Sequence, residues 1–150
     1  MPPADPLEKL VSVGSLKREP PNAEEIAGLI RTAAVRLVDA EKETNAAESR
    51  FDLAYNAAHA LSLAALRLRG YRSDKRYIVF QALPHTLAVD NPTWRLLDRC
   101  HRERNTTEYE GVSALDEKLL TGLIDAANEL LLRVRSLVKS QELSGDASQR

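Results

Sequence analysis

Apolar residues recur every three or four positions over most of this 150-residue chain, and short polar connections separate these stretches. The spacing matches the 3.6-residue period of an α-helix and predicts amphipathic helices. The predicted helices cover residues 6–13, 23–43, 48–69, 77–89, 92–110 and 113–140.

Capping and stop residues bound these helices. Asn22 and Asn45 each precede a Glu at the third helical position, which is a helix-start pattern, and Asp90-Asn91-Pro92 is another. Gly14, Gly70 and Gly111 are predicted stops. We expect Pro84 to kink or break its helix, and residues 71–76 to form a basic loop. Residues 77–80 resemble a short strand, but no second strand is predicted to pair with it, so a helix is favoured.

The predicted fold class is all-α, an up-and-down helical bundle of four to five main helices with a short N-terminal helix. Composition agrees, because Ala and Leu are plentiful, aromatic residues are 5% and hydrophobic residues 43% of the chain. Residues 1–141 are predicted to be a single domain, and the small, polar residues 142–150 a disordered C-terminal tail.

Charge is unevenly distributed along the sequence. The net charge is −1, but residues 67–104 contain nine Lys or Arg and four Asp or Glu, so this segment is +5 and the remainder −6. A basic centre suits a polyanionic ligand, and it also suits an ordinary solvated surface. The absence of an apolar run of about 20 residues and of a signal peptide predicts a cytoplasmic protein without a membrane span.

Several kinds of chemistry have no support in the sequence. The single cysteine, Cys100, excludes an internal disulfide and lies on an apolar stripe, so it is predicted to be a buried thiol. The three histidines are far apart, and phosphate-binding loops, dinucleotide fingerprints and nucleophile elbows are missing. We therefore predict neither a metal site nor a cofactor.

Two lines of polar residues interrupt the apolar pattern. On the alanine-rich 48–69 helix the line either borders a cleft or subunit interface, or is simply the exposed side. On the 92–110 helix Arg104 stands beside the second line and predicts an anion or phosphodiester site, unless it snorkels from a solvated face. If the lines face each other, they form a pocket with one cation and an imidazole. The first line is Asp52, Tyr55, Asn56, His59 and Ser62; the second is Asp98, His101, Asn105 and Tyr109.

The segment Arg104-Asn105-x-x-x-Tyr109 resembles the Arg-Asn-x-x-x-His motif of the HEPN domains. The run from Arg50 to His59, followed by Gly70-Tyr71, is similar to the preceding helix of that family, so the resemblance covers about residues 48–111. It implies a helical bundle that forms a homodimer and brings two motifs together in a cleft. In members that cut RNA, Arg and His act without a metal while the ribose 2′-OH attacks the adjacent phosphate. Such proteins occur in toxin–antitoxin and phage-defence systems, often beside a nucleotidyltransferase partner.

Carried over residue by residue, the resemblance makes Arg104 the phosphate-clamping arginine, Asn105 its neighbour and Tyr109 the third catalytic residue. Tyr109 replaces the family's histidine, and a phenol with a pKa near 10 is a poor general base at neutral pH. His101 or His59 would then have to move protons. The expected substrate-binding residues are Asp52, Tyr55, His59, His101 and Arg102.

The sequence therefore predicts a dimeric HEPN-like domain that binds RNA or another phosphate-bearing ligand, such as a nucleotide, in a cleft between subunits. Metal-independent endoribonuclease activity is the candidate chemistry. The alternative is a non-catalytic helical interaction module that docks a nucleotidyltransferase-type partner. A third interpretation is a helical protein whose polar stripes face solvent.

Overall fold

The computed structural model describes residues 5–110 and 116–148, with side chains for residues 5–105 and 116–142. It is an all-α helical bundle, as predicted, with one two-stranded sheet in the part described. The elements in chain order are α1 (Pro6–Ser12), β1 (Lys17–Arg18), α2 (Ala23–Ala40), α3 (Ala47–Leu68), β2 (Tyr71–Arg72), α4 (Arg76–Gln81), α5 (Leu83–Thr86), α6 (Asn91–Glu110) and α7 (Glu117–Ser148).

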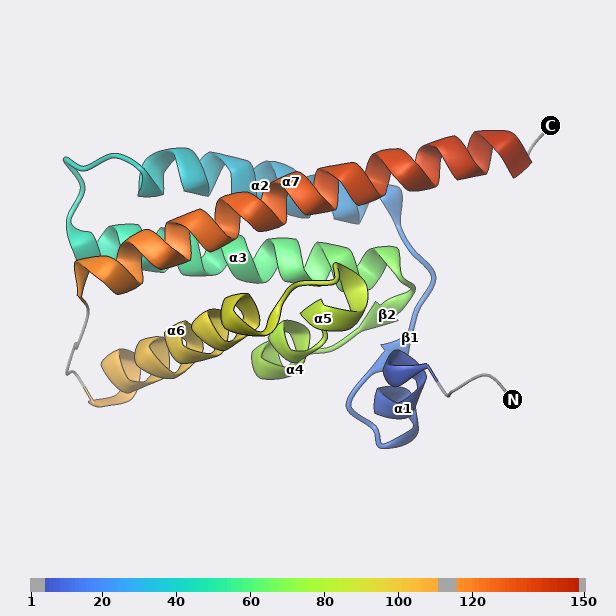
Figure 1. Cartoon of the computed structure of the whole chain (residues 1–150), viewed down its shortest axis with the longest axis horizontal. Coiled ribbons are helices and arrows are strands. Elements are labelled where there is room, and N and C mark those ends of the chain that lie inside the picture. The colour runs from blue at the N-terminus through green and yellow to red at the C-terminus, as the bar shows by residue number, and fades with distance from the viewer. Residues whose placement is uncertain (1–4, 111–115, 149–150) are drawn as a thin grey trace.

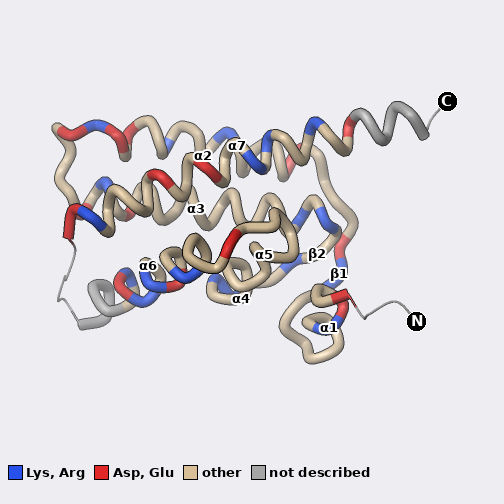
Figure 2. The backbone as a smooth tube through the Cα atoms, viewed as in Figure 1, with Lys and Arg blue, Asp and Glu red and all other residues tan. Residues whose placement is uncertain are grey.

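Helix α3 is the centre of the bundle. Helices α2 and α7 lie along one side of it, and α4, α5 and α6 lie on the other (Figure 1). No charged residue occurs in α3 between Asp52 and Arg67, and the middle of this helix is uncharged in Figure 2. Its alanines let neighbouring helices approach closely, so α3 is buried on several sides. The α3 residues that are 0% exposed include Ala54, Tyr55, Ala58, Leu61 and Ala65.

Most predicted helix ends agree with the structure. The side chain of Asn22 accepts a hydrogen bond from the Glu25 backbone N at 2.9 Å, and that of Asp90 accepts one from the Thr93 backbone N, also at 2.9 Å. Gly14 and Gly70 have φ angles of +80° and +88°, the left-handed conformation that ends a helix.

The predicted cap at Asn45 is wrong. Helix α3 begins after Ala46, which makes no side-chain cap, and Asn45 Nδ2 instead donates to the backbone oxygen of Asp39 at 2.9 Å. The asparagine therefore closes the turn after α2 and does not start α3. Helix starts and turns use the same side-chain chemistry, so the residue type alone does not separate them.

The sequence predicted that Pro84 kinks or breaks the helix over residues 77–89, and the structure shows a break. Helix α4 ends at Gln81, and the short α5 starts at Leu83 with the proline in its first turn, where a missing N–H costs nothing. The chain then continues from Leu87 to Asp90 without a helix. Residues 77–89 are therefore two short helices and a connection.

Two segments differ from the sequence prediction. The predicted loop at residues 71–76 contains β2, which pairs antiparallel with β1 so that Lys17 opposes Arg72 and Arg18 opposes Tyr71. Two-residue strands are too short to show an alternating pattern. Helix α7 continues to Ser148, so residues 142–148, predicted to belong to a disordered tail, are helical. The predicted stop at Gly111 and the predicted start of the last helix at residues 113–115 lie outside the described residues.

A buried arginine joins the N-terminal segment to the end of α3. Arg67 is 1% exposed, and its Nε donates to Glu25 Oε1 at 2.7 Å. Its terminal nitrogens donate to the backbone oxygens of Glu19, Tyr71 and Pro20 at 2.9, 3.3 and 2.8 Å. These bonds fix the chain around β1 and β2 against the bundle.

Among the described residues, no helix is both long enough and apolar enough to cross a bilayer.

Candidate functional site

A group of polar and aromatic side chains lies where α3, α4 and α6 meet, and we call it the polar cluster. It contains a tyrosine at its base, two arginines above it, and an imidazole, an amide and a phenyl ring beside it. Its members are Tyr55 from α3, Arg76 and Phe80 from α4, and His101, Arg104 and Asn105 from α6.

The tyrosine, histidine and asparagine form a chain of hydrogen bonds. The hydroxyl of Tyr55 lies 2.8 Å from Nδ1 of His101, and Nδ2 of Asn105 lies 3.3 Å from Nε2 of the same ring. A neutral imidazole carries one N–H, so with the Asn105 amide in this orientation Nε2 accepts and Nδ1 donates to the tyrosine oxygen.

Two guanidinium groups converge on the ring of Tyr55. The Cζ atom of Arg104 lies 5.0 Å from the ring centroid and that of Arg76 lies 5.5 Å from it, both within cation–π range. Nε of Arg104 is 3.9 Å from Oδ1 of Asp52, and a terminal nitrogen of Arg76 donates to Oδ1 of Asn56 at 3.3 Å. The Asp52 side chain is 62% exposed, so water weakens its attraction for Arg104. The two cations make this a favourable place for an anion.

Burial and positive charge together keep both imidazoles of this region neutral at pH 7. The pKa of His59 is lowered to about 4, mainly by burial and also by the nearby Arg76, His101 and Arg104. Burial also lowers the pKa of His101, partly opposed by Asp98. The pKa of Tyr55 is raised by burial, against the effect of a hydrogen bond from Arg76. The cluster therefore presents fixed cations and neutral hydrogen-bonding groups.

The structure brings together four of the predicted site residues: Tyr55, His101, Arg104 and Asn105. Asp52 stands at the edge of the cluster through its ion pair with Arg104. The two polar lines thus face each other, as one of the sequence interpretations required.

The remaining predicted residues are placed differently. His59 lies one turn along α3, with its ring edge against Phe80 at 5.9 Å between centroids. Arg102 is outside the cluster, because two residues along a helix turn the side chain to the far side; it is 71% exposed and pairs with Asp98 at 3.4 Å. Tyr109 belongs to α6, but its side chain lies outside the described residues.

Two members of the cluster, Arg76 and Phe80, were not predicted. The sequence places Arg76 in a basic loop, whereas the structure makes it the first residue of α4, four residues before the buried Phe80. Their four-residue separation was the available signal, since it puts both on one helix face. That this face packs against α3 and α6 depends on tertiary structure.

Other chemistry in the described residues is limited. Cys100 is 0% exposed and burial raises the pKa of its thiol to about 12, so it is not an activated nucleophile. No group of three or more His, Cys, Asp or Glu side chains within the described ranges is arranged to hold a metal ion.

The fold and the cluster define an all-α helical bundle with a cationic, partly buried polar site. Comparisons of the sequence with protein-family models and with curated proteins give no match. The resemblance to the HEPN domains accordingly rests on the motif residues themselves.

Proposed function

We propose that this protein binds RNA, or another ligand with phosphodiester groups, at the polar cluster. The observation that carries the proposal is the convergence of two guanidiniums from different helices on one buried tyrosine, at 5.0 and 5.5 Å. Two guanidiniums side by side attract a further anion in addition to the exposed Asp52 side chain, which lies 3.9 Å from Arg104. A phosphate group supplies the negative charge and acceptor oxygens that arginine recognises.

Each member of the cluster has a defined part in the proposed complex. Arg76 and Arg104 donate to phosphate oxygens from two helices, which fixes the position of the backbone of the nucleic acid. Tyr55 supports both guanidiniums through its ring. Asn105 orients the His101 ring, and His101 in turn holds Tyr55. The rigidity of this chain keeps the arginines in place before the ligand arrives.

Binding, and not cleavage, is the activity that these groups support best. Cleavage through the ribose 2′-OH needs a base that accepts a proton near neutral pH. The pKa values of His59 and His101 are both lowered, and the two nitrogens of His101 are already engaged. In the HEPN-like arrangement the remaining catalytic position belongs to Tyr109, a phenol. We therefore propose an RNA-binding domain, and RNA cleavage is a separate readout of the test below.

We expect loss of RNA affinity when Arg104 is replaced by alanine. A hydrogen bond to a charged group contributes roughly 1.5–3 kcal/mol, so the dissociation constant should rise by roughly 10- to 150-fold. Fluorescence anisotropy with a labelled single-stranded RNA at several salt concentrations measures this. The salt slope should fall by about 0.7 for each phosphate that the variant no longer binds. EDTA in the buffer and a gel of the recovered RNA show at the same time whether cleavage occurs.

The matched control is Arg95→Ala. Arg95 is an exposed residue of the same helix, nine positions away, and therefore on the opposite face of α6. The Arg95→Ala substitution removes the same charge from the protein but leaves the polar cluster intact. Equal losses in the two variants, or none in Arg104→Ala, would contradict binding at the cluster and leave only a general electrostatic attraction.

The HEPN resemblance further leads us to propose a homodimer in which two polar clusters form one RNA-binding surface. Light scattering coupled to size exclusion should give twice the 16.7 kDa mass of the chain. A mass of a single chain at the concentrations that bind RNA would remove the inter-subunit part of this proposal, but not the cluster itself.

A further inference from the structure

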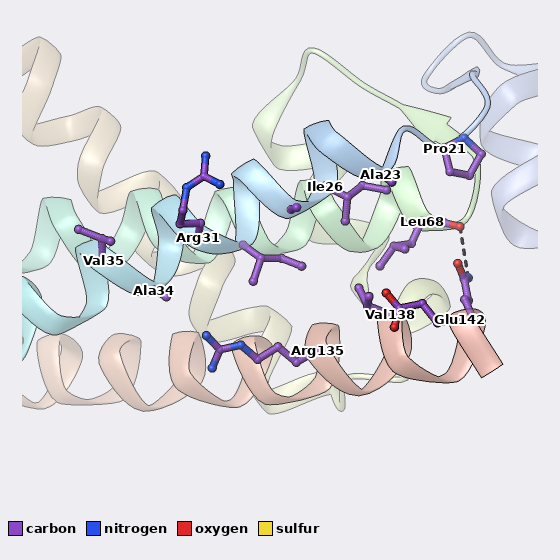
Figure 3. A pocket seen from close by; sticks show the side chains of 13 residues that line it. Pro21, Ala23, Ile26, Arg31, Ala34, Val35, Leu68, Arg135, Val138 and Glu142 are labelled. Carbon is purple, nitrogen blue, oxygen red and sulfur yellow. Dashed lines mark hydrogen bonds between the residues drawn. The ribbon is translucent and has the colours of Figure 1, made fainter. Parts of the chain in front are cut away.

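A long groove lies on the other side of α3 from the polar cluster. It runs between α2 and α7 and has a volume of about 810 Å³ (Figure 3). Alanine, isoleucine and valine side chains form most of its walls, with Leu68 at one end. At the same end Gln141 Nε2 donates to the Leu68 backbone oxygen at 3.3 Å, which closes the floor of the groove.

The walls have the spacing of a surface that packs against a helix. On α2 the lining residues Ala23, Ala27, Ile30 and Ala34 follow one another at four, three and four positions. A helix presents such a row along one face, and a third helix fits between two rows of this kind. From Ala23 to Val38 the row is about 22 Å long, the length of about 15 helical residues.

Exposed apolar side chains extend this surface beyond the groove. Val35 lines it and is 59% exposed. Val38 on α2 is also 59% exposed and Leu132 on α7 is 65% exposed, and both continue the rows that border the groove. Exposed apolar side chains that continue a groove mark an interaction surface better than scattered ones do. An open surface of this length and width is better matched by a helix than by a small molecule, whose surface a pocket mostly encloses.

The charges of the groove select among possible helices. Arg31 on α2 and Arg135 on α7 stand on opposite walls in the same half of the groove, and Glu142 lies at the other end (Figure 3). Two copies of the groove facing each other would bring together four arginines and two glutamates, a surplus of positive charge that is unfavourable. An acidic partner offsets this charge, so it suits the groove better than a second copy does.

We propose that the groove between α2 and α7 docks an acidic amphipathic helix of a partner protein. The apolar face of that helix packs on Ile30, Ala34 and Val138, and its carboxylates pair with Arg31 and Arg135. The opposite half of the docked helix carries few acidic residues because it lies near Glu142. This interaction is independent of RNA binding at the polar cluster.

Selection from a peptide-display library tests the proposal. The probe is a library of helical peptides of about 15 residues, the length of the row from Ala23 to Val38. Leu is fixed at the positions of one helix face, and the flanking positions are drawn equally from Glu, Lys and Gln. Peptides are selected on the full chain and then counter-tested on two variants. Val35→Glu places a charge on the groove wall at an exposed position, and the double variant Arg31→Glu/Arg135→Glu reverses the charge of the walls.

We expect the recovered peptides to be enriched in Glu at the flanking positions of one half of their length. Their affinity should fall at least tenfold for Val35→Glu, and selection on the charge-reversed variant should recover Lys in place of Glu. Enrichment of Lys or Gln on the natural chain, binding that Val35→Glu leaves unchanged, or no enrichment overturns the proposal. A homodimer that Val35→Glu dissociates would assign the groove to a second copy and would also overturn it.

Discussion

Replacing Arg67 by alanine is expected to lower the free energy of unfolding by about 3–5 kcal/mol, as for other buried ion pairs that lose one partner. Arg67 is 1% exposed and donates to Glu25 and to three backbone oxygens. Alanine removes the arginine donor from the three backbone oxygens and one of the two arginines that pair with Glu25, and it leaves a cavity in place of the side chain. Each unsatisfied buried acceptor costs about 1–3 kcal/mol. Urea denaturation followed by circular dichroism measures the loss.

The matched control for this variant is Arg72→Ala. Arg67 also pairs with the Glu19 carboxylate at 3.2 Å, and Arg72 forms ion pairs with the same two carboxylates, Glu19 and Glu25, at 2.6 and 2.7 Å. The Arg72 side chain, however, is 31% exposed. Water can replace it, so its removal should cost at most about 1 kcal/mol. The lysine of Arg67→Lys keeps the charge but cannot reach all four acceptors. Its loss of unfolding free energy should therefore lie between those of Arg67→Ala and Arg72→Ala. Similar losses for Arg67→Ala and Arg72→Ala would show that burial of Arg67 does not govern the stability of the N-terminal segment.

Stability should fall by about 2 kcal/mol between neutral pH and about pH 5 because of His59. In the unfolded chain this histidine binds a proton around its ordinary pKa of 6.5, whereas in the folded protein its pKa is about 4. Between these values the unfolded state holds more protons, so lowering the pH favours unfolding. The contribution of His59 is fully present above pH 6.5 and is lost as the pH falls toward 4. The lowered pKa of His101 acts in the same direction.

The measurement is the free energy of unfolding of the natural chain and of His59→Gln at neutral pH and near pH 5. Glutamine keeps a hydrogen-bonding side chain but does not titrate, so the difference between the two pH values should shrink by about 2 kcal/mol. Comparing each protein with itself removes the effect of glutamine on packing. The same pH dependence in both proteins would contradict a neutral, half-buried His59 beside Phe80.

The helices follow from the sequence because their cause is local. Apolar periodicity placed each of the main helices, and the caps at Asn22 and Asp90 agree with the structure since a side chain and a backbone N–H three residues on are always within reach. The failure at Asn45 has the same origin, because an asparagine between two helices can close the first or open the second. Its hydrogen bond to Asp39 shows that it closes α2.

The candidate site was predictable only in part. The spacing of Tyr55 on one helix and of His101 and Arg104 on another indicated that each carried a polar face, and the structure joins these faces through a 2.8 Å hydrogen bond and a cation–π contact. Arg76 was missed because its part in the site depends on how the short α4 packs. The buried Arg67 was missed for a similar reason, since all of its acceptors except the Tyr71 oxygen lie more than 40 residues away in the sequence.

The sequence by itself determined that this protein is an all-α bundle, where its main helices lie, and which two faces carry polar groups. These properties depend on periods of three and four residues, which the order of residues contains directly. The tertiary structure alone decided that Arg76 joins Arg104 over Tyr55, that Arg102 stays outside, and that α2 and α7 leave a groove between them. Helix packing sets these relations through the fit of whole surfaces, and no short segment of the chain encodes that fit.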